Sequence, residues 1–472
     1  MIASKGSSAE AMVRYIDQSP GLRAPQLAVK IPGMPTLPDL KIMALERQEA
    51  GHEVVDQSAG DIDEVGQPLA DAFIAWIEEC RAKLVADGHA QFKPTAGEAY
   101  GFPAKYYPQY PVVTAQLARS WGARSTPVKA LQTLSGRIAI DLGLRGLLTR
   151  ADDAGKGARR CLILDPLAWS GYRPLADDLG LELVHAAATS GHGLATSAEG
   201  LEAAIAFARD QGLTPVAAVP ILPSNPSGVS TPREELKRYL EVAAAADLPV
   251  MIDAFYSPLA PAGHASVVPL GWLEQNVAPE ALGYLGLIVG ETKVTSSQNK
   301  TASLLWMAPA GHDAVATRVT ERALARLRAT NAYPRPQEAL VAYALHSFED
   351  GVHAAMGPRY QALDATRAAM RAACDALGLP LSIGGSFYGT VALVDAQGQS
   401  LIRDDDGRPV EDPRAICKLM IQRHGLVGAP GGMFSPAPEA GPMLRLTAAV
   451  TPTEVEKVKL IFARLVEQSA AR

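Results

Sequence analysis

The sequence has few cysteines and no paired cysteine motif. Only four cysteines occur in 472 residues, and none of them forms a C-x-x-C pair. They are Cys80, Cys161, Cys374 and Cys417. This scatter argues against a disulfide framework or a zinc site, so we expect core thiols in a reducing compartment.

Long apolar runs and a basic bias are also missing. No uninterrupted apolar stretch reaches the length that spans a bilayer, and the N-terminus lacks the apolar region of a signal peptide. The chain has 44 Lys and Arg residues against 50 Asp and Glu residues, a net charge of −6, which does not suggest a phosphate-backbone partner. We therefore expect a soluble cytoplasmic protein with no membrane or nucleic-acid partner.

The sequence does contain apolar strands that alternate with helical patterns. Strands are predicted at 161–164, 182–185, 216–222, 249–252, 286–289 and 303–307, and helices at about 136–148, 197–211 and 232–246. This alternation predicts an α/β fold with a mostly parallel sheet that is covered on both faces. Ligands of such sheets bind outside the carboxyl ends of the strands, so the chemistry is expected there.

The flanking regions predict further parts. We expect an extended N-terminal arm over residues 1–35, a large domain over 93–354, and a smaller α+β domain made of 36–92 and 355–472. The acidic run at 404–406 is followed by glycine, a pattern that favours a hairpin turn over a metal site. No metal site is predicted.

Polar residues follow several of the predicted strands. Ser135, Gly136 and Arg137 open a helix, whose amides and dipole suit a phosphate, although a simple helix cap would look the same. Trp169 follows the strand at 161–164 and can stack on a planar cofactor or simply pack in the core. These features predict a site only in combination with others.

Three further features complete the set. Asn225 lies in PSNPSGV, where an ordinary turn is the alternative. Asp253 ends a very apolar strand and is followed by Tyr256, so its half-buried charge needs a partner such as a metal or a pyridinium. Lys293 and Lys300 follow the next apolar strand, and each considered singly could be a surface lysine.

In this order and spacing, the motifs resemble the class I/II aminotransferases, the fold-type-I pyridoxal-phosphate enzymes, and look most like the aspartate aminotransferase branch. In that family an N-P-x-G asparagine precedes a D-x-x-Y aspartate by 28 positions, and Asn225 and Asp253 have this separation. LSGRIAI resembles the family's L-S-G-T-G-A-L stretch, and HGLVGAPGGMFSPAPEAGPMLRLTAA resembles its G-V-x-x-x-P-G-x-x-F segment and L-R strand. The similarity runs from about residue 54 to the end.

The resemblance implies a large PLP-binding domain, a smaller α+β domain and the cofactor pyridoxal 5′-phosphate. The implied cofactor-binding residues are Ser135, Gly136, Arg137, Trp169, Asn225, Asp253, Tyr256, Lys293, Lys300 and Tyr106. Asp253 would keep the pyridine nitrogen protonated, and Lys293 would bond to the cofactor aldehyde and move a proton at the substrate Cα. Asn225 and Tyr256 would bind the ring oxygen.

For the substrate, the resemblance implies two residues and a partner chain. Arg445 would hold the α-carboxylate with its two-pronged guanidinium, and Gly60 would belong to a segment that closes over the substrate. A homodimer is implied, with Tyr106, or instead Tyr100, Tyr107 or Tyr110, reaching the neighbouring cofactor phosphate.

The sequence also departs from the family pattern. Position 290 is Gly where a phosphate-binding Ser is common, and position 301 is Thr where the family has Arg. Lys300 could supply the missing phosphate contact, or it could replace Lys293 as the covalent lysine.

The best prediction is an aminotransferase that moves the amino group of an α-amino acid to a 2-oxo acid. The alternative is a PLP-dependent lyase or replacement enzyme of specialised metabolism. One candidate substrate for it is S-adenosylmethionine, as in 1-aminocyclopropane-carboxylate synthase. Decarboxylation is a further alternative. A non-catalytic regulator is disfavoured because the first 50 residues show no helix-turn-helix pattern.

Overall fold

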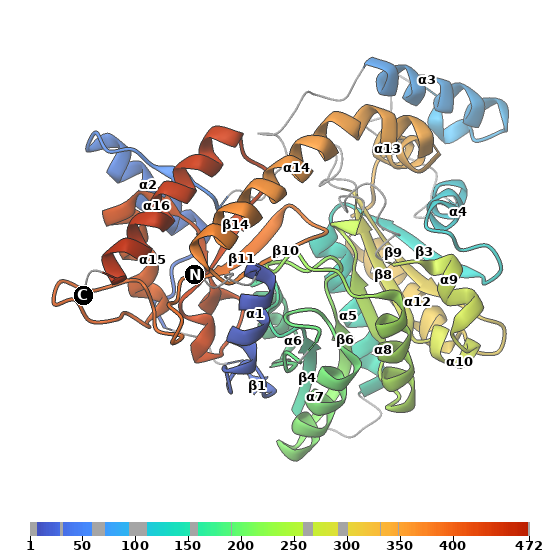
Figure 1. Ribbon diagram of the computed structural model, residues 1–472. Coiled ribbons are helices and arrows are strands. Elements are labelled where there is room, and N and C mark those ends of the chain that lie inside the picture. The colour runs from blue at the N-terminus through green and yellow to red at the C-terminus, as the bar shows by residue number, and fades with distance from the viewer. Residues whose placement is uncertain are drawn as a thin grey trace.

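The computed structural model describes residues 7–28, 32–58, 71–93, 111–151, 159–189, 191–257, 268–290, 301–330, 332–347 and 349–470. It consists of a larger part around an eight-stranded sheet and a smaller part around a four-stranded sheet (Figure 1). Lys293, Lys300, Tyr106 and Gly60 lie outside the described residues.

The large sheet has the strand order β1-β5-β4-β6-β7-β8-β9-β3. The strands are β1 (Gln26–Leu27), β3 (Val128–Thr133), β4 (Arg159–Leu164), β5 (Glu182–His185), β6 (Leu213–Val219), β7 (Val250–Asp253), β8 (Leu285–Gly290) and β9 (Ala302–Met307). The five strands from β5 to β8 in this order are parallel, whereas β9 is antiparallel to both of its neighbours and β1 is antiparallel to β5. The mostly parallel sheet is therefore confirmed.

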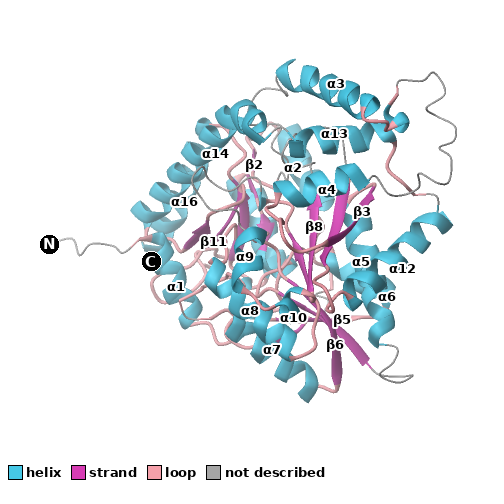
Figure 2. Cartoon of the chain, turned by 90° about the vertical axis from the view of Figure 1, so that its right-hand side faces the viewer, coloured by secondary structure: helices cyan, strands magenta, loops and turns pink. Residues whose placement is uncertain are grey.

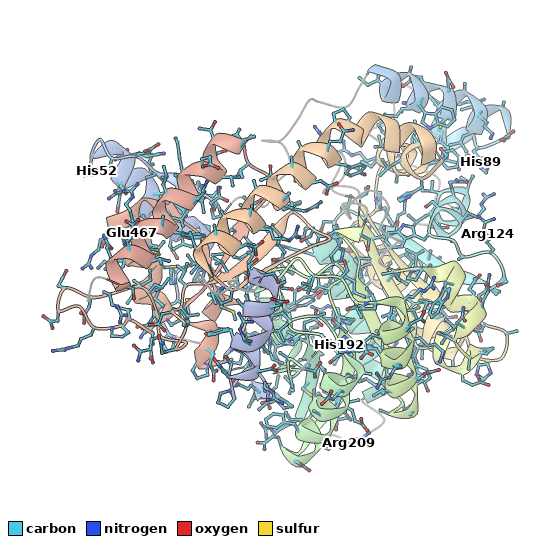
Figure 3. All side chains as sticks on the ribbon, in the orientation of Figure 1. His52, His89, Arg124, His192, Arg209 and Glu467 are labelled. Atoms are coloured by element: carbon cyan, nitrogen blue, oxygen red, sulfur yellow. The ribbon has the colours of Figure 1, made fainter. Side chains whose placement is uncertain are left out.

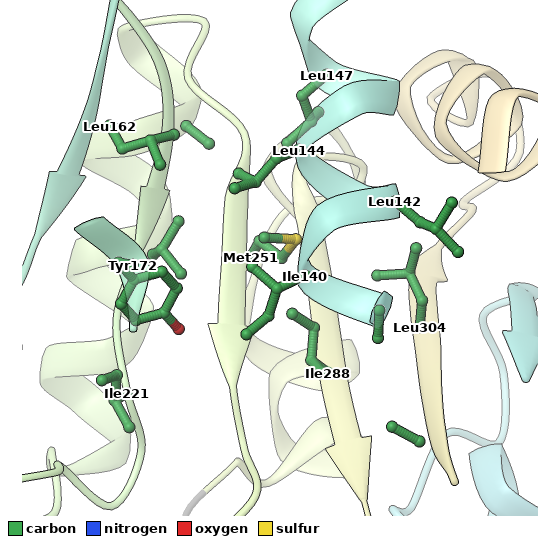
Figure 4. Packing of buried hydrophobic residues seen from close by; sticks show 14 of the residues in the cluster. Ile140, Leu142, Leu144, Leu147, Leu162, Tyr172, Ile221, Met251, Ile288 and Leu304 are labelled. Carbon is green, nitrogen blue, oxygen red and sulfur yellow. The ribbon is translucent and has the colours of Figure 1, made fainter. Parts of the chain in front are cut away.

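Helices cover both faces of this sheet (Figure 2). One face packs against α5 (Gly136–Ala151), α6 (Tyr172–Leu179) and α12 (Ala314–Thr330). The other packs against α4 (Pro111–Ser120), α7 (Ala198–Asp210), α8 (Arg233–Ala245), α9 (Leu270–Asn276) and α10 (Pro279–Leu282). The strands are buried on both sides, which explains why they are continuous apolar runs rather than alternating ones. Figure 4 shows this packing, with Met251 of β7 next to Ile140 of α5.

The smaller part contains the antiparallel sheet β10-β11-β14-β13. Its strands are β10 (Leu381–Ile383), β11 (Tyr388–Ala392), β13 (Ala429–Pro430) and β14 (Met443–Thr447), and a separate parallel pair joins β2 (Val55–Asp56) to β12 (Leu426–Val427). The helices here are α2 (Leu37–Glu49), α14 (Glu349–Leu377), α15 (Pro413–His424) and α16 (Pro452–Ala470). The long helix α14 contains Gly357–Pro358 and runs from the smaller part towards α13 (Pro336–Ser347) (Figure 1).

Helix α3 (Asp71–Ala86) packs against α13, with Cys80 and Leu84 next to Leu340 and Tyr343. The N-terminal segment differs from the extended arm that the sequence predicts, because helix α1 (Ser8–Asp17) occupies part of it. Ser7 and Glu10 form a reciprocal capping box that starts this helix. The acidic run lies in a hairpin closed by the bridge between Arg403 and Pro409, as expected.

Within the described ranges, no helix is both long and apolar enough to cross a membrane. No group of three or more His, Cys, Asp or Glu side chains in this part of the chain could hold a metal ion. The side-chain view illustrates how titratable residues are distributed, with His52 and Glu467 on the smaller part and Arg209 on the larger one (Figure 3).

Candidate active site

Asp253 lies at the carboxyl end of β7, where the sequence places it. Its side chain is buried, and its Oδ2 accepts a hydrogen bond of 2.9 Å from the Tyr172 hydroxyl. The Phe255 amide lies 3.4 Å from Oδ1. Burial raises the pKa of Asp253 to about 6, and these two hydrogen bonds act against the rise. Among the described residues no cation pairs with it, so a buried carboxyl group is available to a positively charged ligand.

Tyr172 is a site residue that the sequence analysis missed. It is the first residue of α6, three positions after Trp169, and it is fully buried. The Trp169 and Tyr172 rings meet edge to face with centroids 5.6 Å apart. No local sequence pattern marks it, because its role depends on Asp253, which follows 81 positions later in the chain.

Asn225, Tyr256 and Arg445 form one hydrogen-bonded group. Asn225 donates from Nδ2 to the Tyr256 hydroxyl at 3.2 Å and accepts at Oδ1 from an Arg445 guanidinium nitrogen, also at 3.2 Å. Asn225 lies in the loop after β6, and Arg445 lies on β14 of the smaller sheet. The structure thus brings together three of the predicted residues from two parts of the fold.

Arg445 is positioned by aromatic and backbone contacts. Its guanidinium carbon lies 4.2 Å from the Tyr388 ring centroid and 5.4 Å from that of Phe434, and a terminal nitrogen donates to the Ser58 carbonyl at 3.1 Å. The side chain is buried, yet its Nε has no hydrogen-bond partner. A buried guanidinium with an unused donor suits a carboxylate ligand.

Ser135, Gly136 and Arg137 lie at the N-terminus of α5, as predicted. The Ser135 hydroxyl accepts from the Ile138 amide at 3.3 Å, so it caps the helix. The Arg137 side chain lies over the Trp169 ring, with its guanidinium carbon 5.3 Å from the ring centroid. The first turn of a 16-residue helix presents free amides to an anion.

Phe255 explains the glycine at position 290. A Cβ added at Gly290 would lie 2.0 Å from a carbon of the Phe255 ring, and one added at Gly136 would lie 2.1 Å from another. The ring therefore occupies the space beside both backbones. The serine that the family commonly has at position 290 does not fit with this phenylalanine.

Tyr172→Phe should lower the stability of the protein, and the loss should be larger at high pH than at low pH. Burial raises the folded-state pKa of Asp253 from its ordinary value of 3.8 to about 6, so the stability that goes with the protonated carboxyl group is fully present below about pH 4 and is lost as the pH rises through about 6. Tyr172→Phe removes a donor that lowers this pKa and extends the loss to higher pH. We expect the cofactor-free variant to lose about 1.5–3 kcal/mol at pH 8 and less at pH 4. Thermal unfolding at the two pH values measures this, and equal losses would contradict it.

Gly290→Ser should lower stability because the Phe255 ring must move. Overpacking of this kind costs about 1–3 kcal/mol. The control is Gly357→Ser, where an added Cβ meets nothing within 4 Å. Thermal unfolding of Gly290→Ser, Phe255→Ala and the double variant should show a favourable coupling between the two positions. Additive losses would mean that the ring does not set the residue at 290.

Comparison with known proteins agrees with this geometry. Residues 102–459 match the model of the family described as aminotransferase class I and II. The chain belongs to this family. The sequence matches none of the curated proteins with which it was compared.

Solved structures of aminotransferases share the fold. An aspartate aminotransferase from Thermus thermophilus has a TM-score of 0.67 at 16% identity, covering 93% of this chain and 97% of the other. The aspartate aminotransferase from Rhizobium meliloti has a TM-score of 0.68 at 14% identity, covering 94% and 99%. Bna3p from Saccharomyces cerevisiae, a putative kynurenine aminotransferase, has a TM-score of 0.67 at 14% identity, covering 93% and 99%. The predicted fold-type-I architecture is confirmed.

Proposed function

We propose that this chain is a pyridoxal-phosphate-dependent aminotransferase that moves the amino group of an α-amino acid to a 2-oxo acid. The observation that carries the proposal is a pair of buried groups, one at the carboxyl end of β7 in the large sheet and the other on β14 of the smaller sheet. Asp253 is a buried carboxyl group without a cation, and Arg445 is a buried cation with an unused donor. A ring nitrogen and a substrate carboxylate are the two partners that satisfy them.

Family membership implies pyridoxal 5′-phosphate, and the described residues fit it. Asp253 would face the ring nitrogen, Asn225 and Tyr256 would bond the ring oxygen, and the first turn of α5 would hold the phosphate. Trp169 would stack on the ring. Because Arg137 lies over the Trp169 ring, stacking on that face requires the guanidinium to move aside.

The bound cofactor would supply an acceptor for the electron pair left at the substrate Cα. Asp253 holds a proton on the ring nitrogen, and the hydrogen bond from Tyr172 keeps the carboxylate oriented. Arg445 orients the α-carboxylate, while the rings of Tyr388 and Phe434 exclude water from it. These contacts act together to fix the Cα–H bond relative to the base.

We propose Lys293 as that base and as the covalent lysine. The alternative is Lys300, and neither residue is among those that the structure describes. Borohydride reduction of the cofactor-loaded protein followed by peptide mapping identifies the labelled lysine. Lys293→Ala and Lys300→Ala form a matched pair, of which only the first should abolish labelling.

Transamination is tested by a single turnover without a 2-oxo acid acceptor. Each protein chain should release about one 2-oxo acid from a good amino donor and no ammonia, because the amino group stays on the protein-bound cofactor. Addition of a different 2-oxo acid should then return that amino group as a new amino acid. Continuous release of a 2-oxo acid with ammonia would instead indicate a lyase, and no reaction with any amino acid would sink the proposal.

Three further parts of the proposal concern residues and partners beyond this network. We propose that the chain acts as a homodimer in the cytoplasm, that Tyr106 contacts the cofactor phosphate of the neighbouring subunit, and that the segment around Gly60 closes over the substrate. The last of these is supported by Ser58, two positions before Gly60. The Ser58 carbonyl accepts a hydrogen bond from Arg445, so the chain leading to Gly60 passes next to the proposed carboxylate site.

A further inference from the structure

A cavity of about 480 Å³ lies next to the candidate active site. It is bounded by the segment from Gly33 to Pro38, the loop that carries Trp169, and the segment from Gly432 to Pro436. The last two are tied together, since the Ala168 amide donates to the Phe434 carbonyl at 2.9 Å. Phe434 is therefore shared, with its ring near Arg445 and its surface lining the cavity.

Most of the cavity wall is apolar or aromatic. Trp169 and Phe434 contribute rings, and Met34 and Met433 contribute thioethers. The volume falls in the usual range for small-molecule sites. A wall of this kind accommodates the carbon chain of a ligand and supplies dispersion contacts rather than fixed hydrogen bonds.

The charge of the cavity is positive. No Asp or Glu is among the described residues that line it, whereas Arg137 and Arg173 are. His185 also lines it, but burial lowers the pKa of this histidine to about 4, so it is neutral at pH 7. Arg173 is 3.9 Å from Asp177 and donates to the Ala28 carbonyl. Within the described ranges Arg137 has no carboxylate partner, and its guanidinium lies over Trp169.

We propose that this cavity receives the substrate side chain and that Arg137 binds an anionic group at its end. The inference rests on the proposed function and specifies its substrate class as an amino acid whose apolar side chain ends in a carboxylate. Arg445 holds the α-carboxylate, Phe434 separates the two arginines, and the side chain lies along the Trp169 wall. The side chain of Arg137 thus determines specificity, while its backbone amide remains at the proposed phosphate site in the first turn of α5.

The test compares two unreactive anions that differ by one charge. Adipate and hexanoate both present a carboxylate to Arg445, but only adipate has a second one for Arg137. Calorimetric titration of the cofactor-loaded protein should show adipate binding about 10- to 100-fold more tightly than hexanoate. In Arg137→Met this preference should fall to about one.

Arg233→Met is the matched control, because Arg233 lies 5.1 Å from the Trp272 ring centroid in a similar stacked arrangement on α8. This variant should keep the preference for adipate. An unchanged preference in Arg137→Met would overturn the inference, and so would a wild-type protein that binds neither anion. Because no turnover is needed, a preference that disappears in Arg137→Met supports the cavity even when the single-turnover assay shows that the reaction is not transamination.

Discussion

Asp253→Asn should lower kcat of the cofactor-loaded protein by about 10²- to 10⁴-fold. The estimate of scale follows from the 3–5 kcal/mol that is lost when one partner of a buried charge pair is removed, with about 1.4 kcal/mol for each tenfold change in rate. The asparagine keeps the shape of the side chain and can still accept from Tyr172, but it carries no charge to hold a proton on the ring nitrogen. Steady-state kinetics with saturating cofactor measures the effect.

Asp165→Asn provides the matched control for this prediction. Asp165 is a second buried carboxyl group, just after β4, and it accepts from the Thr196 hydroxyl and from the Ile221 amide at 2.9 Å. It undergoes the same chemical change without touching the proposed ring position. We expect a kcat within about tenfold of wild type, since its role is to hold the backbone near Ile221. Equal losses in both variants would show that the charge of Asp253 has no special role.

Arg445→Lys should raise KM for the amino acid by about 30- to 4000-fold, which corresponds to the 2–5 kcal/mol lost when one partner of a buried charge pair is truncated. Lysine keeps the positive charge but cannot present two parallel donors, and it cannot stack on Tyr388 in the same way. The measurement is KM for the amino donor at fixed 2-oxo acid concentration.

Arg367→Lys is the control for general damage to a buried arginine. Arg367 is buried on α14, pairs with Asp364 at 2.6 Å and donates to the Ser386 carbonyl at 3.0 Å. Its replacement should lower the unfolding temperature and leave KM near the wild-type value. If both variants raise KM alike, Arg445 is a structural residue and the carboxylate site lies elsewhere.

The parallel strands and the residues that end them were predictable from the sequence. All six predicted strands are present, because strands buried on both faces are continuous apolar runs such as VMI in β7. The separation of Asn225 and Asp253 also indicated the site. Asn225 follows the end of β6 and Asp253 ends β7, so the length of the intervening helix α8 and of β7 determines this separation. Strand β3 was missed, since its first three positions are only partly buried and its sequence VKALQT has no such run.

Other parts of the site could not be predicted, because they depend on packing between distant segments. The contact of Phe255 with Gly136 and Gly290 joins three strand ends, and no local pattern at any of them indicates it. Tyr172 is an ordinary helix residue until Asp253 is placed next to its hydroxyl. The direction of the Arg137 side chain likewise depends on Trp169, 32 positions away in the sequence.

The Gly357–Pro358 pair in α14 has a mechanical consequence. Proline has no amide hydrogen, so this 29-residue helix lacks one of its internal hydrogen bonds at that point, and the adjacent glycine adds no side chain to stiffen it. The C-terminal end of the same helix packs in the core of the smaller part through Met370 and Cys374. Bending at this pair would move the smaller part, including β14 and its Arg445, relative to the large sheet.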